Sequence, residues 1–168
     1  MGTTVALENH IEWSESRSPH PRKAFGLKQD RDWRRASMPY DFEVSDVLPA
    51  TPKAIYDAWM SSAGHSAMTG APATVDSRAG GAFEAWDGYI TGRTLLLEPA
   101  KRIVQSWRTT EFSDADEDSQ IEVVLQPVDL ATRITIRHTN VPDGHHGYEQ
   151  GGWQENYFDP MRTYFAPV

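Results

Sequence analysis

This 168-residue chain is organised around the segment Gly80-Gly81-Ala82-Phe83-Glu84-Ala85-Trp86-Asp87-Gly88-Tyr89-Ile90-Thr91-Gly92. The segment predicts a strand, a tight turn at Asp87-Gly88 and a second strand, because Asp-Gly between apolar runs is a strong hairpin signal. The sequence continues through Leu97-Glu98-Pro99 to Ile103-Val104-Gln105-Ser106-Trp107-Arg108, which predicts another turn and a third strand. These three strands indicate the middle of an antiparallel sheet on which the rest of the chain must pack.

Alternation of apolar and polar residues extends this sheet in both directions along the sequence. Thr51 and Pro52 predict the start of a helix that runs to about Met60, since Thr is a favourable N-cap and Pro suits the first helical turn. A second short helix is predicted over residues 61–68. The strands are expected near residues 40–48, 73–77, 82–86, 89–98, 101–110, 119–128 and 131–140.

After Pro142-Asp143-Gly144 the apolar period changes from that of a strand to that of a helix. One face of this C-terminal helix is expected to be wide and aromatic, and therefore to need a sheet as its cover. Pro160 lies inside the helix and should bend it, because proline cannot donate to the carbonyl of Asn156. The residues expected to point inward are Trp153, Tyr157, Phe158, Met161, Tyr164 and Phe165.

Composition excludes several classes of function. The chain has no cysteine, so it has neither disulfides nor thiolate metal sites, and no apolar run is long enough to cross a membrane. The net charge is -8, and it is unevenly spread: seven Lys and Arg stand against five acidic residues before residue 40, and nine against nineteen from there on. An acidic body repels phosphate backbones, so we expect no nucleic-acid partner. The absence of a long apolar run and of the apolar core of a secretory signal predicts no membrane partner and a cytoplasmic protein.

Residues 1–37 differ from the rest, being basic and rich in Arg, Ser, Pro and His. We expect a poorly structured segment there, because it could bury too little apolar surface to offset the entropy of ordering. Arg34-Arg35-Ala36-Ser37 fits a basic-directed phosphorylation motif. A further hypothesis is that Met38 is the true start of the protein, since the recognisable domain begins there.

Several short motifs, none of which would identify a fold alone, follow one another in a specific order. They are Thr51-Pro52, His65-Ser66-Ala67-Met68-Thr69-Gly70, Gly80-Gly81-Ala82-Phe83, Trp86-Asp87-Gly88-Tyr89-Ile90-Thr91-Gly92, Leu97-Glu98-Pro99, Ile103-Val104-Gln105-Ser106-Trp107-Arg108, Thr139-Asn140-Val141-Pro142 and Gly151-Gly152-Trp153. Over residues 41–166 this series resembles the activator of 90-kDa heat shock protein ATPase homologue family. The resemblance implies that residues 38–168 form an α+β helix-grip (START-like) domain. In that fold a curved seven-stranded antiparallel sheet wraps around a long C-terminal helix, and two short helices follow the first strand.

The fold implied by this resemblance leaves a cavity between the sheet and the helix. His65 and Met68 would then lie at its mouth, where they either touch a ligand or partner or simply fill that end of the domain. Trp86 and Trp107 are expected on strands, where they either line the cavity or pack as core. Trp153 and Tyr157 should face the sheet from the helix, so the six ligand-binding candidates are His65, Met68, Trp86, Trp107, Trp153 and Tyr157.

Other polar residues have simpler interpretations. Arg93, Arg108 and Arg137 occupy polar strand positions and are expected to form exposed cross-strand pairs. His138, near the end of the last strand, is expected to be a hydrogen-bonded structural residue. His145-His146 lacks further ligands at metal-binding spacing. The acidic run Asp114-x-Asp116-x-Asp118 lacks the glycine and closing glutamate of a calcium loop.

The sequence contains no phosphate loop, dinucleotide-binding glycine pattern or nucleophile elbow, so we expect no cofactor, no metal and no catalytic residue. The resemblance implies a non-enzymatic, cochaperone-like or stress-linked role with the 90-kDa heat shock chaperone as partner. Family activators usually carry a second, N-terminal chaperone-binding domain, which this chain does not resemble. The alternative is binding, or enzymatic conversion, of a small hydrophobic molecule in the cavity between sheet and helix.

Overall fold

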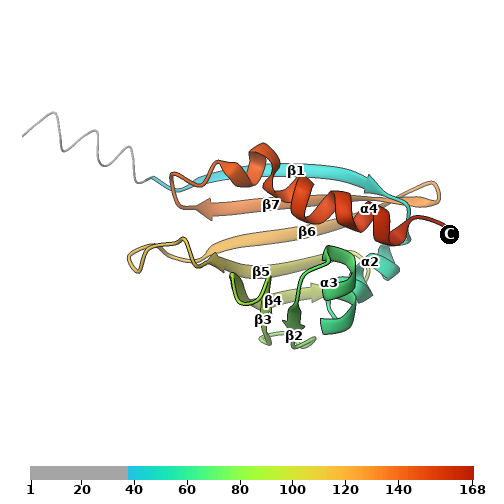
Figure 1. Ribbon diagram of the computed structural model, residues 1–168, viewed down its shortest axis with the longest axis horizontal. Coiled ribbons are helices and arrows are strands. Elements are labelled where there is room, and N and C mark those ends of the chain that lie inside the picture. Colours follow the sequence, from blue (N-terminus) through green and yellow to red (C-terminus); the bar gives the residue numbers. More distant parts are fainter. Residues whose placement is uncertain (1–37) are drawn as a thin grey trace, which may run out of the picture.

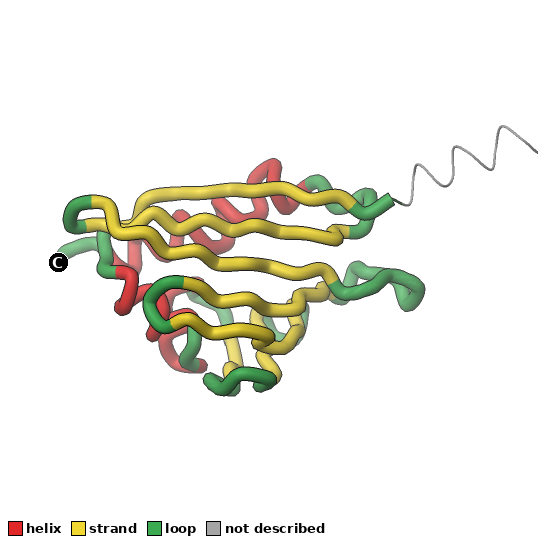
Figure 2. Tube along the Cα trace, turned by 180° about the vertical axis from the view of Figure 1, so that it is seen from behind, coloured by secondary structure: helices red, strands yellow, loops and turns green. Residues whose placement is uncertain are grey.

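A seven-stranded antiparallel sheet carries the helices of this protein on one face (Figure 1). The computed structural model describes residues 38–168, and the strands lie side by side in the order β1-β7-β6-β5-β4-β3-β2. Seen from behind, the strands run across the front and the helices lie beyond them (Figure 2). The strand bounds are β1 Tyr40–Leu48, β2 Ala73–Val75, β3 Ala82–Ala85, β4 Ile90–Glu98, β5 Arg102–Thr109, β6 Ser119–Val128 and β7 Ala131–Val141.

The predicted order of elements and the α+β helix-grip architecture are confirmed. Two short helices, α2 (Pro52–Trp59) and α3 (Ser62–Thr69), follow β1, and a C-terminal helical region packs against the sheet. The expectations for residues 1–37, namely a poorly structured basic segment and a phosphorylation motif, lie outside the described residues.

Local sequence explains why α2 begins at Pro52. The Thr51 hydroxyl accepts a hydrogen bond from the Ala54 backbone N–H at 3.2 Å, which satisfies one of the free donors of the first turn. Pro52 occupies that turn, where its missing N–H costs nothing. The helix then buries Ile55 and Trp59 against the sheet.

The turn between β3 and β4 differs in one respect from the prediction. Trp86, Asp87 and Gly88 all have left-handed backbone, with φ values of 57°, 55° and 81°. The Tyr89 N–H donates to the Trp86 carbonyl at 3.1 Å and closes the turn. The predicted turn is confirmed at Asp87-Gly88, but it begins earlier, so the expectation that Trp86 lies on a strand is wrong.

The C-terminal region is built from wide helical turns followed by a regular helix. Two π-helical segments, η1 (Tyr148–Gly152) and η2 (Gln154–Phe158), lie on either side of Trp153, η1 is broken within by the non-helical backbone of Gly151, and α4 spans Asp159–Phe165. The departure from α-helical geometry therefore comes before Pro160, which sits in the first turn of α4. Both π-turns and prolines are recognised causes of bends in helices.

The inward face of this region also departs from the expected period at its end. Trp153, Tyr157 and Met161 are buried as predicted, whereas Tyr164 is 47% exposed. Phe165 takes the inward position in the last turn of α4 and contacts the core, and Tyr164 packs edge-on against it. The expectation that Tyr164 faces the sheet is therefore wrong.

Strong alternation of buried and exposed residues places the core between the sheet and the helices. On β5 every second residue is buried, and on β6 and β7 Ile121, Val123 and Ile136 are fully buried. Such burial stabilises the fold by roughly 25 cal/mol per Å² of apolar surface. The core thus fixes the sheet face on which the C-terminal helix lies.

The outer face of the sheet carries the expected charges, but only Arg137 pairs across strands as predicted. Its guanidinium reaches Glu43 on β1 at 2.9 Å and Glu122 on β6 at 3.5 Å. Arg93 instead donates to the Gly80 carbonyl at 3.1 Å. Arg108 donates to the Ser113 and Asp116 carbonyls and to the Asp118 carboxylate, so it holds the acidic loop rather than a neighbouring strand.

Candidate functional site

A cavity of about 150 Å³ lies between the C-terminal helix and the β3–β5 part of the sheet. Its wall is mainly aromatic, with contributions from the β3–β4 turn, β5, η1 and η2. Ile90, Gly152 and Asn156 complete the lining. The six aromatic lining residues are Trp86, Tyr89, Trp107, Tyr148, Trp153 and Tyr157.

The lining rings hold each other in place. Trp107 on β5 meets Tyr148 edge to face, with centroids 5.1 Å apart and planes at 85°. Trp153 packs 5.9 Å from Trp107 and 4.8 Å from Tyr157. Edge-to-face and tilted contacts at these distances are favourable, so the wall is preformed.

His138 supports this wall from behind. The Trp153 indole N–H donates to His138 Nδ1 at 3.3 Å, which makes Nε2 the protonated nitrogen of the neutral ring. Nε2 lies 2.8 Å from Ser119 Oγ, and that hydroxyl donates to the Trp107 carbonyl. Burial lowers the pKa of His138 to about 3. The prediction of a hydrogen-bonded structural histidine is confirmed.

His65 and Met68 do not line the cavity, although the sequence placed them at its mouth. Both lie on the buried side of α3, which packs against η2 and α4. His65 Nδ1 lies 3.0 Å from the Trp59 carbonyl, and Nε2 lies 3.4 Å from the Tyr157 hydroxyl. Burial lowers the pKa of His65, so it is a neutral residue behind the cavity wall. Of the six candidates, the structure brings together Trp86, Trp107, Trp153 and Tyr157.

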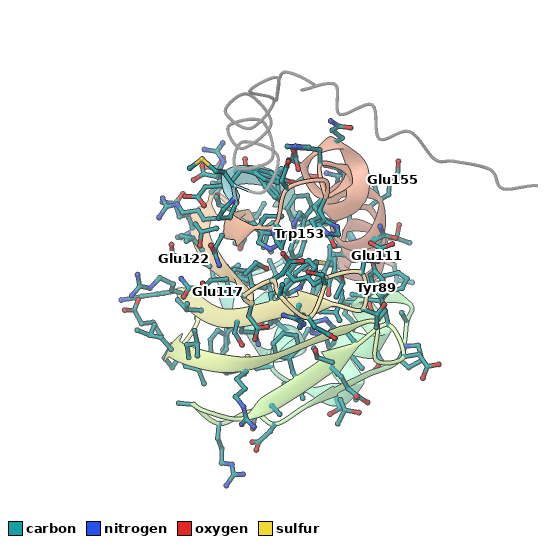
Figure 3. The ribbon with its side chains drawn as sticks, turned by 90° about the vertical axis from the view of Figure 1, so that its left-hand side faces the viewer. Tyr89, Glu111, Glu117, Glu122, Trp153 and Glu155 are labelled. Atoms are coloured by element: carbon teal, nitrogen blue, oxygen red, sulfur yellow. The ribbon has the colours of Figure 1, made fainter. Side chains whose placement is uncertain are left out.

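The rim of the cavity carries polar groups that the sequence did not single out. The Tyr89 hydroxyl donates to the Glu111 carboxylate at 2.8 Å, and the Tyr148 and Thr109 hydroxyls are 3.0 Å apart. Figure 3 shows Tyr89 and Glu111 together at one side of the molecule, with Trp153 further inside. Burial, assisted by Glu111, raises the pKa of Tyr89, so its hydroxyl stays protonated.

The cavity lining therefore offers few kinds of polar group. Its polar side chains are tyrosine hydroxyls, indole N–H groups and the Asn156 amide. The Trp86 indole nitrogen is buried and finds no hydrogen-bond partner within residues 38–168. Across the same residues, no three His, Asp or Glu side chains gather closely enough to hold a metal ion. None of the helices described there is long and apolar enough to cross a membrane.

These features can be compared with known proteins. A family model described as activator of Hsp90 ATPase homolog 1-like protein matches residues 49–166. The chain belongs to this family. The match begins just before α2 and ends just after α4, so it includes every cavity-lining residue.

Two relatives and one solved structure illustrate the extent of the similarity. An uncharacterized protein of Schizosaccharomyces pombe is 29% identical over 126 residues, which cover 75% of this chain and 37% of that protein. The activator of 90 kDa heat shock protein ATPase homolog 1 of Homo sapiens is 28% identical over 125 residues, which cover 73% of this chain and 36% of the human protein. The chain thus spans about a third of the length of these relatives.

In structure, an Hsp90 activator from Plasmodium falciparum matches with a TM-score of 0.67 at 22% sequence identity. The match covers 74% of this chain and 94% of that chain. At this level of identity the likeness establishes the fold, and the fold is that of the activator family.

Proposed function

We propose that this protein is a non-enzymatic, cochaperone-type domain that contacts the 90-kDa heat shock chaperone. The observation that carries the proposal is the family match over residues 49–166, nearly the whole described domain. The cavity lining supports a non-enzymatic role, because it contains no histidine, carboxylate or lysine that could move a proton near neutral pH. The matched segment covers only 37% and 36% of the two relatives, so the proposal concerns chaperone contact, and stimulation of the chaperone's ATPase is measured separately.

The full-length protein is expected to bind purified Hsp90 in roughly the micromolar range or tighter, as specific protein contacts do. Calorimetry or analytical ultracentrifugation measures this binding, and a coupled assay measures the chaperone's ATPase rate. Because chaperones also bind unfolded chains, the matched control is the destabilised Gly92→Ala variant discussed below. A specific cochaperone binds Hsp90 no more tightly when its fold is weakened, because the chaperone recognises its folded state. Binding that rises in Gly92→Ala, or no binding by either protein, would contradict the proposal.

A second function is favoured by one observation, the preformed apolar cavity. We propose that it binds a small, largely apolar molecule. A cavity of about 150 Å³ is the size that accepts a single benzene ring in other proteins, and it is smaller than the pockets of roughly 300–1,000 Å³ that hold drug-sized ligands. A single ring or a group of similar size is therefore the expected occupant.

Benzene, used as a probe, is expected to shift the NMR signals of the Trp107 and Trp153 indole N–H groups and to raise Tm. The Asn156→Phe variant should remove both effects by filling the cavity from its edge. Thr163→Phe is the matched control, because Thr163 is exposed on α4 away from the lining. Unchanged indole signals at saturating benzene would exclude this function.

A further inference from the structure

The cavity has the arrangement of an aromatic box. Trp107 and Tyr148 pack edge to face, and Trp153 and Tyr157 continue the aromatic lining along the helix. The face of an aromatic ring carries negative electrostatic potential, so a ring face turned toward this space attracts a cation. No lysine or arginine lines this space.

The surroundings of the box add negative charge at its rim. The Glu111 carboxylate is exposed and is held there by the Tyr89 hydroxyl at 2.8 Å. The two buried histidines that touch the lining do not oppose it, because burial lowers the pKa of both His138 and His65. The approach to the box is therefore favourable for a positive ligand.

The backbone at Trp86 gives an independent indication that this wall is more than core packing. Trp86 has a φ of 57°, a left-handed conformation that a bulky side chain adopts only against an energetic cost. Strained residues of this kind cluster at functional sites, where the surrounding structure holds them. Here the conformation places a half-buried tryptophan at the edge of the cavity.

We propose that the box binds a small organic cation of the methylated ammonium class. This inference rests on the cavity-binding function proposed above and names its ligand. Methyl groups on nitrogen spread the charge over an apolar surface that suits aromatic faces and needs no hydrogen-bond acceptor. Within the box, a primary ammonium would find only the Asn156 amide and tyrosine hydroxyls as acceptors, since the Glu111 carboxylate stands outside at the rim.

The lining also disfavours an anion as the occupant. The Trp153 N–H is already donated to His138 and is not available to a ligand. The box lacks the convergent N–H and guanidinium groups by which proteins hold a carboxylate or phosphate.

The test titrates the full-length protein with choline and, separately, with the neutral alcohol in which a carbon atom replaces the choline nitrogen. Because the two probes share one shape, their difference reports the charge alone. Choline is expected to bind about tenfold more tightly, the ratio that about 1.4 kcal/mol of cation–π attraction gives. Calorimetry or the indole N–H signals in NMR measure both affinities.

Two carboxylate variants test the rim. Glu111→Gln should weaken choline binding about threefold or more and leave the neutral alcohol unchanged. Glu117→Gln removes the same charge from the exposed acidic loop and should alter neither affinity (Figure 3). A Glu111 effect that Glu117 reproduces would show general charge attraction and would overturn the role of the rim.

The outcomes separate the two proposals. Equal affinity for choline and the neutral alcohol would overturn the inference while leaving a cavity for apolar molecules. Binding of benzene but of neither probe would also overturn it. Failure of benzene, choline and the alcohol together would remove the cavity-binding function itself.

Discussion

Replacing Gly92 by alanine is expected to lower the free energy of unfolding by about 3 kcal/mol, the upper part of the range for overpacked sites. A Cβ atom at this position would lie 1.9 Å from the Ser106 carbonyl oxygen and 2.7 Å from Phe83 Cε1. The carbonyl belongs to the backbone of β5 and cannot rotate away as a side-chain tip could. Relief therefore requires β4 and β5 to move apart at their centre.

Urea denaturation of Gly92→Ala and Gly147→Ala provides the comparison. Gly147 has helical backbone with φ of -62°, and a Cβ there would meet no atom within 4 Å. Alanine at residue 147 is therefore expected to be neutral, or stabilising by about 0.5 kcal/mol through the unfolded state. If the two variants unfold at the same urea concentration, the close approach at Gly92 does not constrain the sheet.

Gly92 also shows how far the sequence could specify the fold. A glycine in mid-strand predicts a bulge or the close approach of another segment. The approaching atoms belong to the neighbouring strands, β5 and β3. The glycine indicates that there is no room for a side chain at residue 92. Which segment crowds it depends on how distant strands pair, and no local sequence pattern contains that information.

The same limit applies to Trp86 and to the C-terminal helix. Turn chemistry correctly predicted Asp87-Gly88, yet the left-handed conformation of Trp86 is unfavourable locally and must be imposed by packing. The regular period of the helix predicted Tyr157 and Met161 correctly. It failed at Tyr164, because a period of 3.6 residues cannot be carried unchanged through the wider turns of η2 before Pro160.

Cavity residues were predictable where they belong to long aromatic patterns. Trp107 and Trp153 were expected from a strand and a helix that face each other, and both line the cavity. Tyr89 and Tyr148 were missed, since one follows the turn and the other precedes the regular aromatic period. The Tyr89–Glu111 hydrogen bond joins residues 22 positions apart, across a register that only the folded sheet defines.

Acidification is expected to destabilise the protein by about 2 kcal/mol between pH 7 and pH 5 through His138 alone. The unfolded imidazole binds a proton near its usual pKa of 6.5, whereas burial lowers the folded pKa to about 3. Between these values the unfolded state holds more protons, so stability falls as pH falls. Above about pH 6.5 both states are neutral and this contribution is fully present. His65 acts in the same direction, because burial lowers its pKa as well.

Urea denaturation at both pH values, for the wild type and His138→Gln, measures this effect. Glutamine can accept from the Trp153 indole and donate to Ser119, as His138 does, but it does not titrate. The variant should therefore lose less stability between pH 7 and pH 5. The difference between the losses of the two proteins measures the contribution of His138. His146 has the opposite effect on stability as pH falls, because its Glu149 partner raises its pKa. This residue is exposed and is present in both proteins, so it does not affect the comparison. The prediction fails if both proteins lose the same stability between pH 7 and pH 5, or if the NMR signal of the folded His138 imidazole titrates near pH 6.5. Either result would show that water reaches this ring behind Trp107 and Trp153.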